Sequence, residues 1–164
     1  MVNQAKNNEK VISELFESTF FSGFSFDCNF TLKFSRNKVL YYEGKKLPQH
    51  FILTILTDWW FDLKKDWMGK VESLNNYNAI EPEEPVQAFE LAILRWSDGA
   101  EVKEVKFNEE CMTLIFKNKK ALSILCESDE DYAWIIEENK FPANDSKWSA
   151  VCEDRKVYVE IKED

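Results

Sequence analysis

Residues 126–138, CESDEDYAWIIEE, hold a dense group of side chains that could do chemistry. Carboxylates there lead into a short aromatic stretch, and the side chains of interest are Glu127, Asp129, Glu130, Asp131, Tyr132 and Trp134. Such a group could bind calcium, supply a catalytic acid–base pair, receive a basic partner or simply begin a helix. Each interpretation makes its own demand on the neighbouring residues.

The calcium interpretation fails on spacing. A loop of the EF-hand type needs ligands at alternating positions, a glycine at the turn and a glutamate at position 12. The stretch DEDYAWIIEENK, residues 129–140, has Ala133 and Trp134 where an Asn or Asp and the glycine are required. We therefore predict no metal site in this segment.

A helix that begins at Ser128 fits the same stretch better. Ser128 and Asp131 have the spacing of a capping box, with aspartate in place of the usual Glu or Gln. Asp129 and Glu130 would lie in the first turn, where the helix dipole stabilises each negative charge by about 0.3–1 kcal/mol. We predict a short helix, and its acids remain free to form a docking patch for a basic protein.

A second pair of carboxylates surrounds an aromatic run. Asp58 and Asp62 flank Trp59, Trp60 and Phe61, an arrangement that could form a sugar-like pocket with aromatic walls. Two-sided packing of the three aromatic residues in a covered strand is the interpretation we favour for the run. An exposed aromatic that anchors an interface is the third interpretation.

Other catalytic and cofactor chemistries lack suitable residues. His50 is the only histidine, it follows Pro48 closely, and we expect it to be structural or exposed. The cysteines, Cys28, Cys111, Cys126 and Cys152, include no Cys-x-x-Cys pair, so a zinc site is disfavoured. Those in the apolar stretches SILCES and SAVCED, Cys126 and Cys152, are interpreted as small core residues. The four glycines are isolated, so no phosphate-binding loop is present. We predict no cofactor and no enzymatic activity.

The negative charge is concentrated in the second half of the chain. The formal net charge is −9 over 164 residues. Residues 1–80 carry 10 basic and 9 acidic side chains, a balance of +1, and residues 81–164 carry 11 and 21, a balance of −10. Nucleic-acid binding is disfavoured because phosphate contacts need a basic surface, and a basic protein partner is favoured instead. We expect no membrane span, because no run of about 18 apolar residues exists, and we expect a cytoplasmic location.

The first half indicates one helix followed by strands. Helical spacing of apolar residues predicts a helix over 8–21, and strict alternation over 24–34 predicts one long strand. The residues SRNK, 35–38, would turn the chain into a return strand at 39–43. The aromatic and β-branched residues of 51–63 predict another strand, and a helix is an alternative within 62–74.

The second half indicates an antiparallel meander. Strands are predicted at 87–96, 101–107, 111–116 and 121–127, with a final hairpin formed by 146–153 and 157–163. The fold class is therefore α+β, mainly antiparallel sheet with an N-terminal helix and one or two short helices. A single domain, 1–164, is expected, and the alternative is two lobes, 1–74 and 86–164, joined by the polar linker 75–85.

The chain resembles the immunity proteins of bacterial toxin–immunity systems. The resemblance lies in its acidic balance, its β-rich meander, its many Trp and Tyr residues and the pattern L-x-I-x(n)-D-Y-A-W at 122–134. It implies a cytoplasmic protein that neutralises a basic, nuclease-like toxin domain by binding it. The acids and aromatics of 127–134 would then bind the partner, and the second candidates are the linker acids Glu81, Glu83 and Glu84.

Two rival functions remain open on the sequence alone. One is a small-molecule or carbohydrate-binding domain or hydrolase that uses Asp58, Asp62 and the wall formed by Trp59 and Trp60. The other is a structural adaptor whose acids serve only solubility. The three hypotheses differ in whether the acids of the second half converge on one face, and in whether a pocket lies beside the tryptophans.

Overall fold

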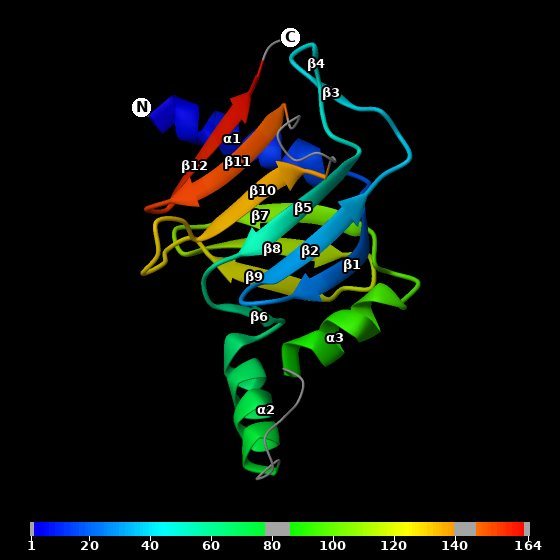
Figure 1. Cartoon of the computed structure of the whole chain (residues 1–164), viewed down its shortest axis with the longest axis vertical. Coiled ribbons are helices and arrows are strands. Elements are labelled where there is room, and N and C mark those ends of the chain that lie inside the picture. Colours follow the sequence, from blue (N-terminus) through cyan, green and yellow to red (C-terminus); the bar gives the residue numbers. More distant parts are fainter. Residues whose placement is uncertain (1, 78–85, 140–146, 163–164) are drawn as a thin grey trace.

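Two antiparallel sheets packed face to face form the body of the protein, and their strands cross (Figure 1). The computed structural model describes residues 2–77, 86–139 and 147–162. Within these residues, helices cover the margins of the sheets: α1 contacts an edge strand of each sheet, and α2 and α3 lie at the other end. The predicted α+β class, with its antiparallel sheets and N-terminal helix, is confirmed.

The larger sheet has, in spatial order, β1 (Phe20–Phe26), β2 (Phe30–Ser35), β5 (His50–Ile55), β10 (Trp134–Glu138), β11 (Trp148–Glu153) and β12 (Lys156–Ile161). The smaller sheet has β6 (Trp59–Phe61), β9 (Ala121–Leu125), β8 (Cys111–Phe116) and β7 (Val102–Phe107). A small ribbon pairs β3 (Tyr41–Tyr42) with β4 (Lys45–Lys46). The helices are α1 (Val2–Phe16), α2 (Lys64–Tyr77) and α3 (Val86–Arg95).

Both sheets combine strands from the two halves of the chain. In the larger sheet β5 pairs with β10, which places Leu53 opposite Ile136 and Ile55 opposite Trp134. In the smaller sheet β6 pairs with β9. Strands that precede and follow residues 75–85 therefore share both sheets. Helix α2 continues to Tyr77, so the beginning of the predicted linker is helical, and residues 78–85 lie outside the described part.

The core fills the space between the two sheets. Alternate residues of β2 are buried, as the period-two pattern predicted, and alternate residues of β5 are buried as well. Completely buried side chains come from both sheets, among them Leu32, Leu53, Ile136, Met112 and Leu122. Each such side chain contributes about 1.5–3 kcal/mol by leaving water, so the face-to-face contact of the sheets is the main source of stability.

Three strand predictions in the first half are wrong. The single strand expected over 51–63 is two strands in different sheets, β5 and β6, and the alternative helix within 62–74 is present as α2 from Lys64 onward. The expected long strand over 24–34 is a hairpin in which Phe26 pairs with Phe30. Its turn has three residues, so the alternation continues unbroken across it and resembles a single strand. The helix predicted over 8–21 ends at Phe16, where the Thr19 hydroxyl donates to the Phe16 carbonyl oxygen at 2.9 Å, and Phe20 begins β1. The return strand expected at 39–43 is only the two-residue β3.

One strand prediction in the second half is also wrong, because residues 87–96 form most of helix α3 rather than a strand. The segment is rich in Ala, Leu, Gln and Glu, which are good helix formers. Its apolar residues cover most of the helix surface, so the helical period is hidden. The remaining strand predictions of the second half agree with β7, β8, β9, β11 and β12 to within a few residues.

Arg36 joins the end of α1 to the larger sheet from inside the core. Its side chain is buried, and its Nη1 donates to the Leu15 carbonyl oxygen at 2.9 Å and its Nη2 to that of Pro48 at 2.7 Å. The last carbonyl groups of a helix form the negative end of its dipole, where a cation is favourable. Burial lowers the pKa of Arg36, and the charge of Glu17 acts in the opposite direction. Arg36, the second residue of the turn predicted at 35–38, is therefore a core residue.

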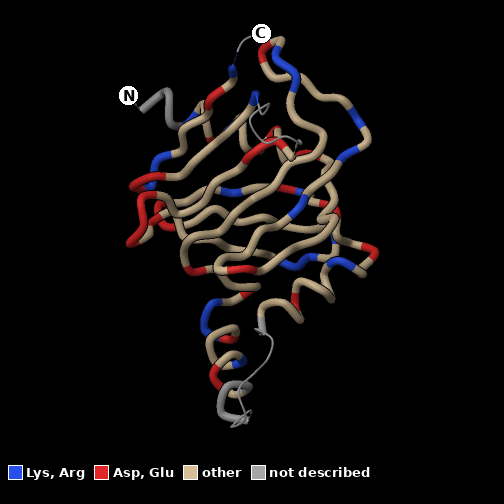
Figure 2. The backbone as a smooth tube through the Cα atoms, in the orientation of Figure 1, with Lys and Arg blue, Asp and Glu red and all other residues tan. Residues whose placement is uncertain are grey.

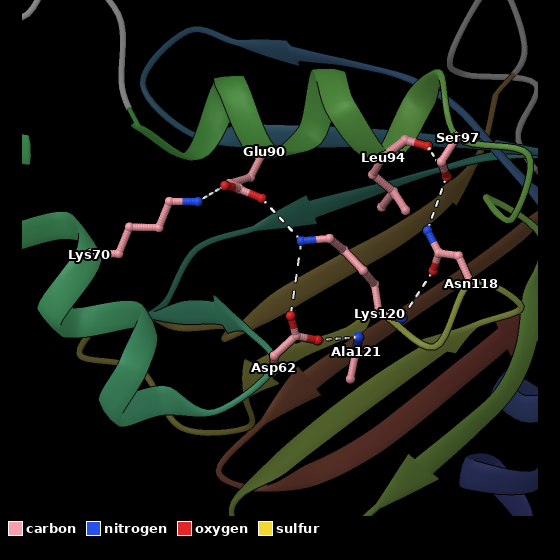
Figure 3. Close-up of polar contacts among 8 residues, drawn as sticks. All are labelled: Asp62, Lys70, Glu90, Leu94, Ser97, Asn118, Lys120 and Ala121. Atoms are coloured by element: carbon pink, nitrogen blue, oxygen red, sulfur yellow. Dashed lines mark hydrogen bonds and ion pairs between the residues drawn. The ribbon is translucent and has the colours of Figure 1, made fainter.

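A polar network fastens α3 to α2 and to the smaller sheet (Figure 3). Glu90 of α3 is buried, accepts a hydrogen bond from Lys120 Nζ at 3.1 Å and forms an ion pair with Lys70 of α2. Asp62 follows β6, accepts the backbone N–H of Ala121 at 3.0 Å and has its carboxylate 3.9 Å from Lys120 Nζ. The buried carboxylate is thus compensated by two ammonium groups, which fixes the position of α3.

The C-terminal end of α3 is held by the β8–β9 turn. Asn118 Nδ2 donates to Ser97 Oγ at 3.0 Å (Figure 3). Asn118 N also donates to the Gly99 carbonyl oxygen at 3.3 Å. A Cβ atom on residue 99 would overlap the Asn118 side chain and lie 2.7 Å from its Cα atom. Glycine is therefore required at this close approach of two backbones.

Replacing Arg36 with methionine should lower the free energy of unfolding by about 2–4 kcal/mol, because buried carbonyl groups lose their donor. Urea denaturation followed by tryptophan fluorescence measures this. Arg95→Met is the matched control: Arg95 Nε donates to the Ser22 carbonyl oxygen from an exposed position, and the expected loss is below about 1 kcal/mol. Equal losses in the two variants would contradict the role assigned to Arg36.

Replacing Gly99 with alanine should cost about 1–3 kcal/mol, because the added methyl group forces the α3 end away from the β8–β9 turn. Gly69→Ala in α2, where nothing lies within 4 Å of the new Cβ, should instead be neutral or stabilise by up to about 1 kcal/mol. Thermal unfolding of both variants tests the contrast. A Gly99→Ala protein as stable as the wild type would show that the two backbones do not approach this closely.

Candidate functional site

Four connections between strands meet at one end of the two sheets. They are the β5–β6, β7–β8, β9–β10 and β11–β12 connections, and backbone hydrogen bonds link them to one another. Leu125 N donates to the Asp58 carbonyl oxygen at 3.1 Å, Cys126 N to that of Glu110 at 2.8 Å, and Arg155 N to that of Cys126 at 2.9 Å. These hydrogen bonds hold the four connections together, so this end of the protein forms one continuous surface.

Local sequence explains the shape of these connections. Asn108 Oδ1 accepts the backbone N–H groups of Glu110 and Cys111, both at 2.8 Å, which closes the β7–β8 turn. Asp154 and Arg155 have φ angles of 46° and 63°, as in the two-residue turns that suit the twist of a hairpin. The hydrogen bonds that hold these turns in place are made by their backbones. Their charged side chains are exposed to solvent.

The surface formed by these connections is strongly acidic, and we call it the acidic end. Its charged residues are Asp58, Glu109, Glu110, Glu127, Asp129, Glu130, Asp131, Glu153, Asp154, Arg155 and Lys156, all of them exposed. Nine carboxylates and two cations give a balance of −7, out of −9 for the whole chain. In Figure 2 most of these acids gather along the left side of the molecule.

The only guanidinium of the acidic end is engaged locally. Arg155 Nε donates to Glu127 Oε2 at 3.1 Å, and its Nη2 forms an ion pair with the same oxygen. The hydrogen bond to Glu127 and then its charge raise the pKa of Arg155, and the charges of Glu110 and Glu109 act in the same direction. The remaining carboxylates of this surface are therefore available to attract cationic side chains of another molecule.

An open depression of about 540 Å³ lies within the acidic end. It is lined by Leu56, Thr57, Asp58, Leu125, Glu127, Ser128, Asp129 and Glu130. The Thr57 hydroxyl donates to the Glu127 carbonyl oxygen at 2.6 Å, which joins the two sides of the depression. Oxygen atoms dominate its polar lining, so it suits lysine or arginine side chains of another molecule. No three metal-binding side chains among the described residues are grouped so as to hold an ion.

The structure divides the predicted partner-binding residues into three groups. The four carboxylates, those of Glu127, Asp129, Glu130 and Asp131, are exposed in the acidic end. Tyr132 beside them is half-buried. Trp134 is completely buried, so its indole belongs to the core and cannot anchor a partner. The linker acids Glu81, Glu83 and Glu84 lie outside the described residues. Sequence reasoning missed Glu109, Glu110, Glu153 and Asp154, whose proximity to 127–131 arises only from the pairing of strands.

The helix predicted to begin at Ser128 is wrong. Residues 128–133 form a loop, and Trp134 begins β10. The Ser128 hydroxyl does accept the Glu130 backbone N–H at 3.0 Å, but the turn that it closes does not continue. β10 pairs with β5 on one side and β11 on the other, and these two ladders outweigh the local capping signal.

The second predicted pair of carboxylates does not converge on a common pocket. Asp58 lines the depression of the acidic end, whereas Asp62 binds Ala121 and lies near Lys120 (Figure 3). Trp60 is buried, and Trp59 packs edge-on against Phe30 with ring centres 5.1 Å apart. The aromatic run is thus packed against both neighbouring layers, which favours the structural interpretation of Trp59 and Trp60.

Two cysteine side chains lie directly beneath the acidic end. Cys126 and Cys152 are buried, and Cys152 Sγ lies 3.5 Å from the Cys126 carbonyl oxygen. The hydrogen bond between the two thiols and then burial raise the pKa of Cys152, so this thiol stays protonated. Both cysteines serve packing here, as the sequence predicted, and they support the backbone that carries Glu127.

Comparisons with known proteins give no relative from which to read a function. No protein-family model matches the chain, and no curated protein or solved structure matches it. Among the described residues, no helix has the length and apolar character needed to cross a membrane. The functional argument therefore depends on the surface itself.

Thiol reactivity tests the packing beneath this surface. Cys28 is exposed and Cys111, Cys126 and Cys152 are buried, so a disulfide reagent should modify one thiol rapidly in the native protein and four after denaturation. A Cys28→Ser variant should lose the rapid phase. Rapid modification of two or more thiols in the native state would contradict the closed packing around Cys126 and Cys152.

Proposed function

We propose that this protein is a binding module that neutralises a basic protein, as an immunity protein does with a nuclease-like toxin domain, through its acidic end. The observation that carries the proposal is the convergence of nine exposed carboxylates from four separate connections, with only two cations among them. Scattered acids would serve solubility alone. A charge of −7 at one end of a small protein produces a negative electrostatic potential on that side, which steers a basic partner toward it.

The chemistry of the expected partner supports this function. A protein that cleaves nucleic acid must bind phosphate, so its active face is basic. An acidic surface attracts such a face over a distance and raises the association rate by a factor of about 10 to 1,000 at low salt. The depression beside Asp58 and Glu127 can receive a lysine or arginine side chain, and half-buried Tyr132 adds an aromatic contact.

The geometry supports the carbohydrate-binding alternative less well. Trp59 and Trp60 are occupied by packing, and Asp62 takes part in the network around Glu90. A sugar site needs aromatic faces that are free to stack on the ligand. We accordingly place the function at the acidic end, with no catalytic step.

The test compares two variants with the same change in net charge. The first neutralises the acidic end by Glu109→Gln, Glu110→Gln, Asp129→Asn and Glu130→Gln. The control neutralises four exposed acids elsewhere on the surface, by Glu43→Gln, Glu72→Gln, Glu137→Gln and Glu160→Gln. The product of the neighbouring gene is tested as the binding partner, and co-expression measures whether this chain suppresses its toxicity.

We expect the acidic-end variant to associate at least about tenfold more slowly at low salt and to show a weaker dependence on salt than the wild type. The control should stay within about twofold of the wild type, and both should unfold at similar temperatures. Surface plasmon resonance at two ionic strengths measures the rates. Equal effects of the two variants, or an acidic partner, would overturn the proposal.

A further inference from the structure

We propose that the outward face of α3 is a surface through which two copies of this chain associate. Phe89, Ile93 and Trp96 follow one another at spacings of four and three residues, which places them on one side of the helix. Their side chains are 69%, 47% and 82% exposed. Trp96 continues the helical pattern, because its N–H donates to the Ala92 carbonyl oxygen at 3.3 Å.

The opposite side of α3 is firmly attached, so the exposed face is a stable surface. Leu91 and Leu94 are completely buried, and Glu90 forms the ionic network with Lys70 and Lys120. The helix packs against β1, and Arg95 Nε donates to the Ser22 carbonyl oxygen at 2.7 Å. α3 therefore presents its three apolar side chains in a fixed orientation.

The exposed area of this face approaches what a small dimer interface needs. With 150–250 Å² for each large aromatic side chain, Phe89 and Trp96 expose roughly 300 Å² per copy. Two copies would bury about 600 Å² from these rings alone, and Ile93 and the neighbouring atoms add to this toward the ~1,000 Å² expected of a specific interface.

The arrangement suits a second copy because it is self-complementary. If two α3 helices pack antiparallel about a twofold axis near Ile93, Phe89 of each copy lies beside Trp96 of the other, and opposite ends of the helix dipoles meet. A twofold interface requires such a match of one patch with itself.

Charge favours a second copy over the other candidates. The acidic end accounts for −7 of the net −9, so the rest of the molecule carries only −2 and repels a copy weakly. A basic partner needs carboxylates to pair with, and Phe89, Ile93 and Trp96 offer it only apolar side chains. Arg95, stacked 5.3 Å from the Trp96 ring, is the only cation within α3, whereas a membrane-surface helix needs several.

In Figures 1 and 2, α3 lies away from the acidic turns, so association through it leaves the proposed docking surface free.

The experiment is sedimentation velocity of the full chain over a range of concentrations. The wild type should approach twice its 19.4 kDa mass, and Ile93→Glu and Trp96→Glu should each raise the dissociation constant at least about 30-fold. Tyr41→Glu, at a residue 63% exposed on β3, is the matched control and should leave the dimer intact. Thermal unfolding confirms that each variant is folded.

Three results would overturn the inference. They are a wild-type protein that stays monomeric up to about 1 mM, a dimer that survives both α3 substitutions, and a dimer lost equally in Tyr41→Glu. Flotation with vesicles of anionic and of neutral lipids is measured in parallel. Vesicle binding by a monomeric wild type that Trp96→Glu abolishes would assign the face to a membrane instead. None of these results depends on whether the acidic end binds a basic protein.

Discussion

The pairing of β5 with β10 is the constraint on which the rest of this structure depends. It joins residues 51–55 to residues 134–138 in the middle of the larger sheet, so the two halves of the chain cannot separate without exposing the core. Because Ile55 lies opposite Trp134, the β5–β6 and β9–β10 connections leave the sheet at the same end. The acidic end is a direct result of this register, since Asp58 follows one strand and Glu127 to Asp131 precede the other.

The sequence predicted the fold class well where one face of a strand is polar and the other is buried. β12 was predicted on such a pattern, and the alternation of β2 was recognised although its hairpin with β1 was not. Two kinds of signal failed. The three-residue turn after Phe26 preserves the alternation and hides a hairpin, and the apolar residues of α3 hide its helical period because one side is buried and the other is exposed but also apolar. Arg36 shows a third limit of prediction from sequence. Its neighbours in the sequence do not indicate that its guanidinium is buried and donates to the carbonyl oxygen of Pro48.

The candidate site was predictable in part. The charge balance of the second half and the segment 127–131 pointed to an acidic surface, and those acids are exposed. Glu109, Glu110, Glu153 and Asp154 could not be assigned to it, because only the pairing of strands brings the β7–β8 and β11–β12 hairpins beside the β9–β10 connection. Trp134 was assigned to the surface by its neighbours in sequence, but alternation along β10 turns its side chain inward.

Helix α1 has a consequence for how this chain behaves among many copies of itself. It contacts β12 and β7, which are edge strands of the two sheets, and Asn8 Nδ2 donates to the Val157 carbonyl oxygen at 2.8 Å. An uncovered edge strand offers unpaired backbone groups to any other strand, which is how sheets polymerise. At the opposite edge, β1 is bridged to Glu101 at the start of β7. The N-terminal helix therefore lies against both of these edge strands, β12 and β7, and losing it would expose their backbone groups to strands of other copies.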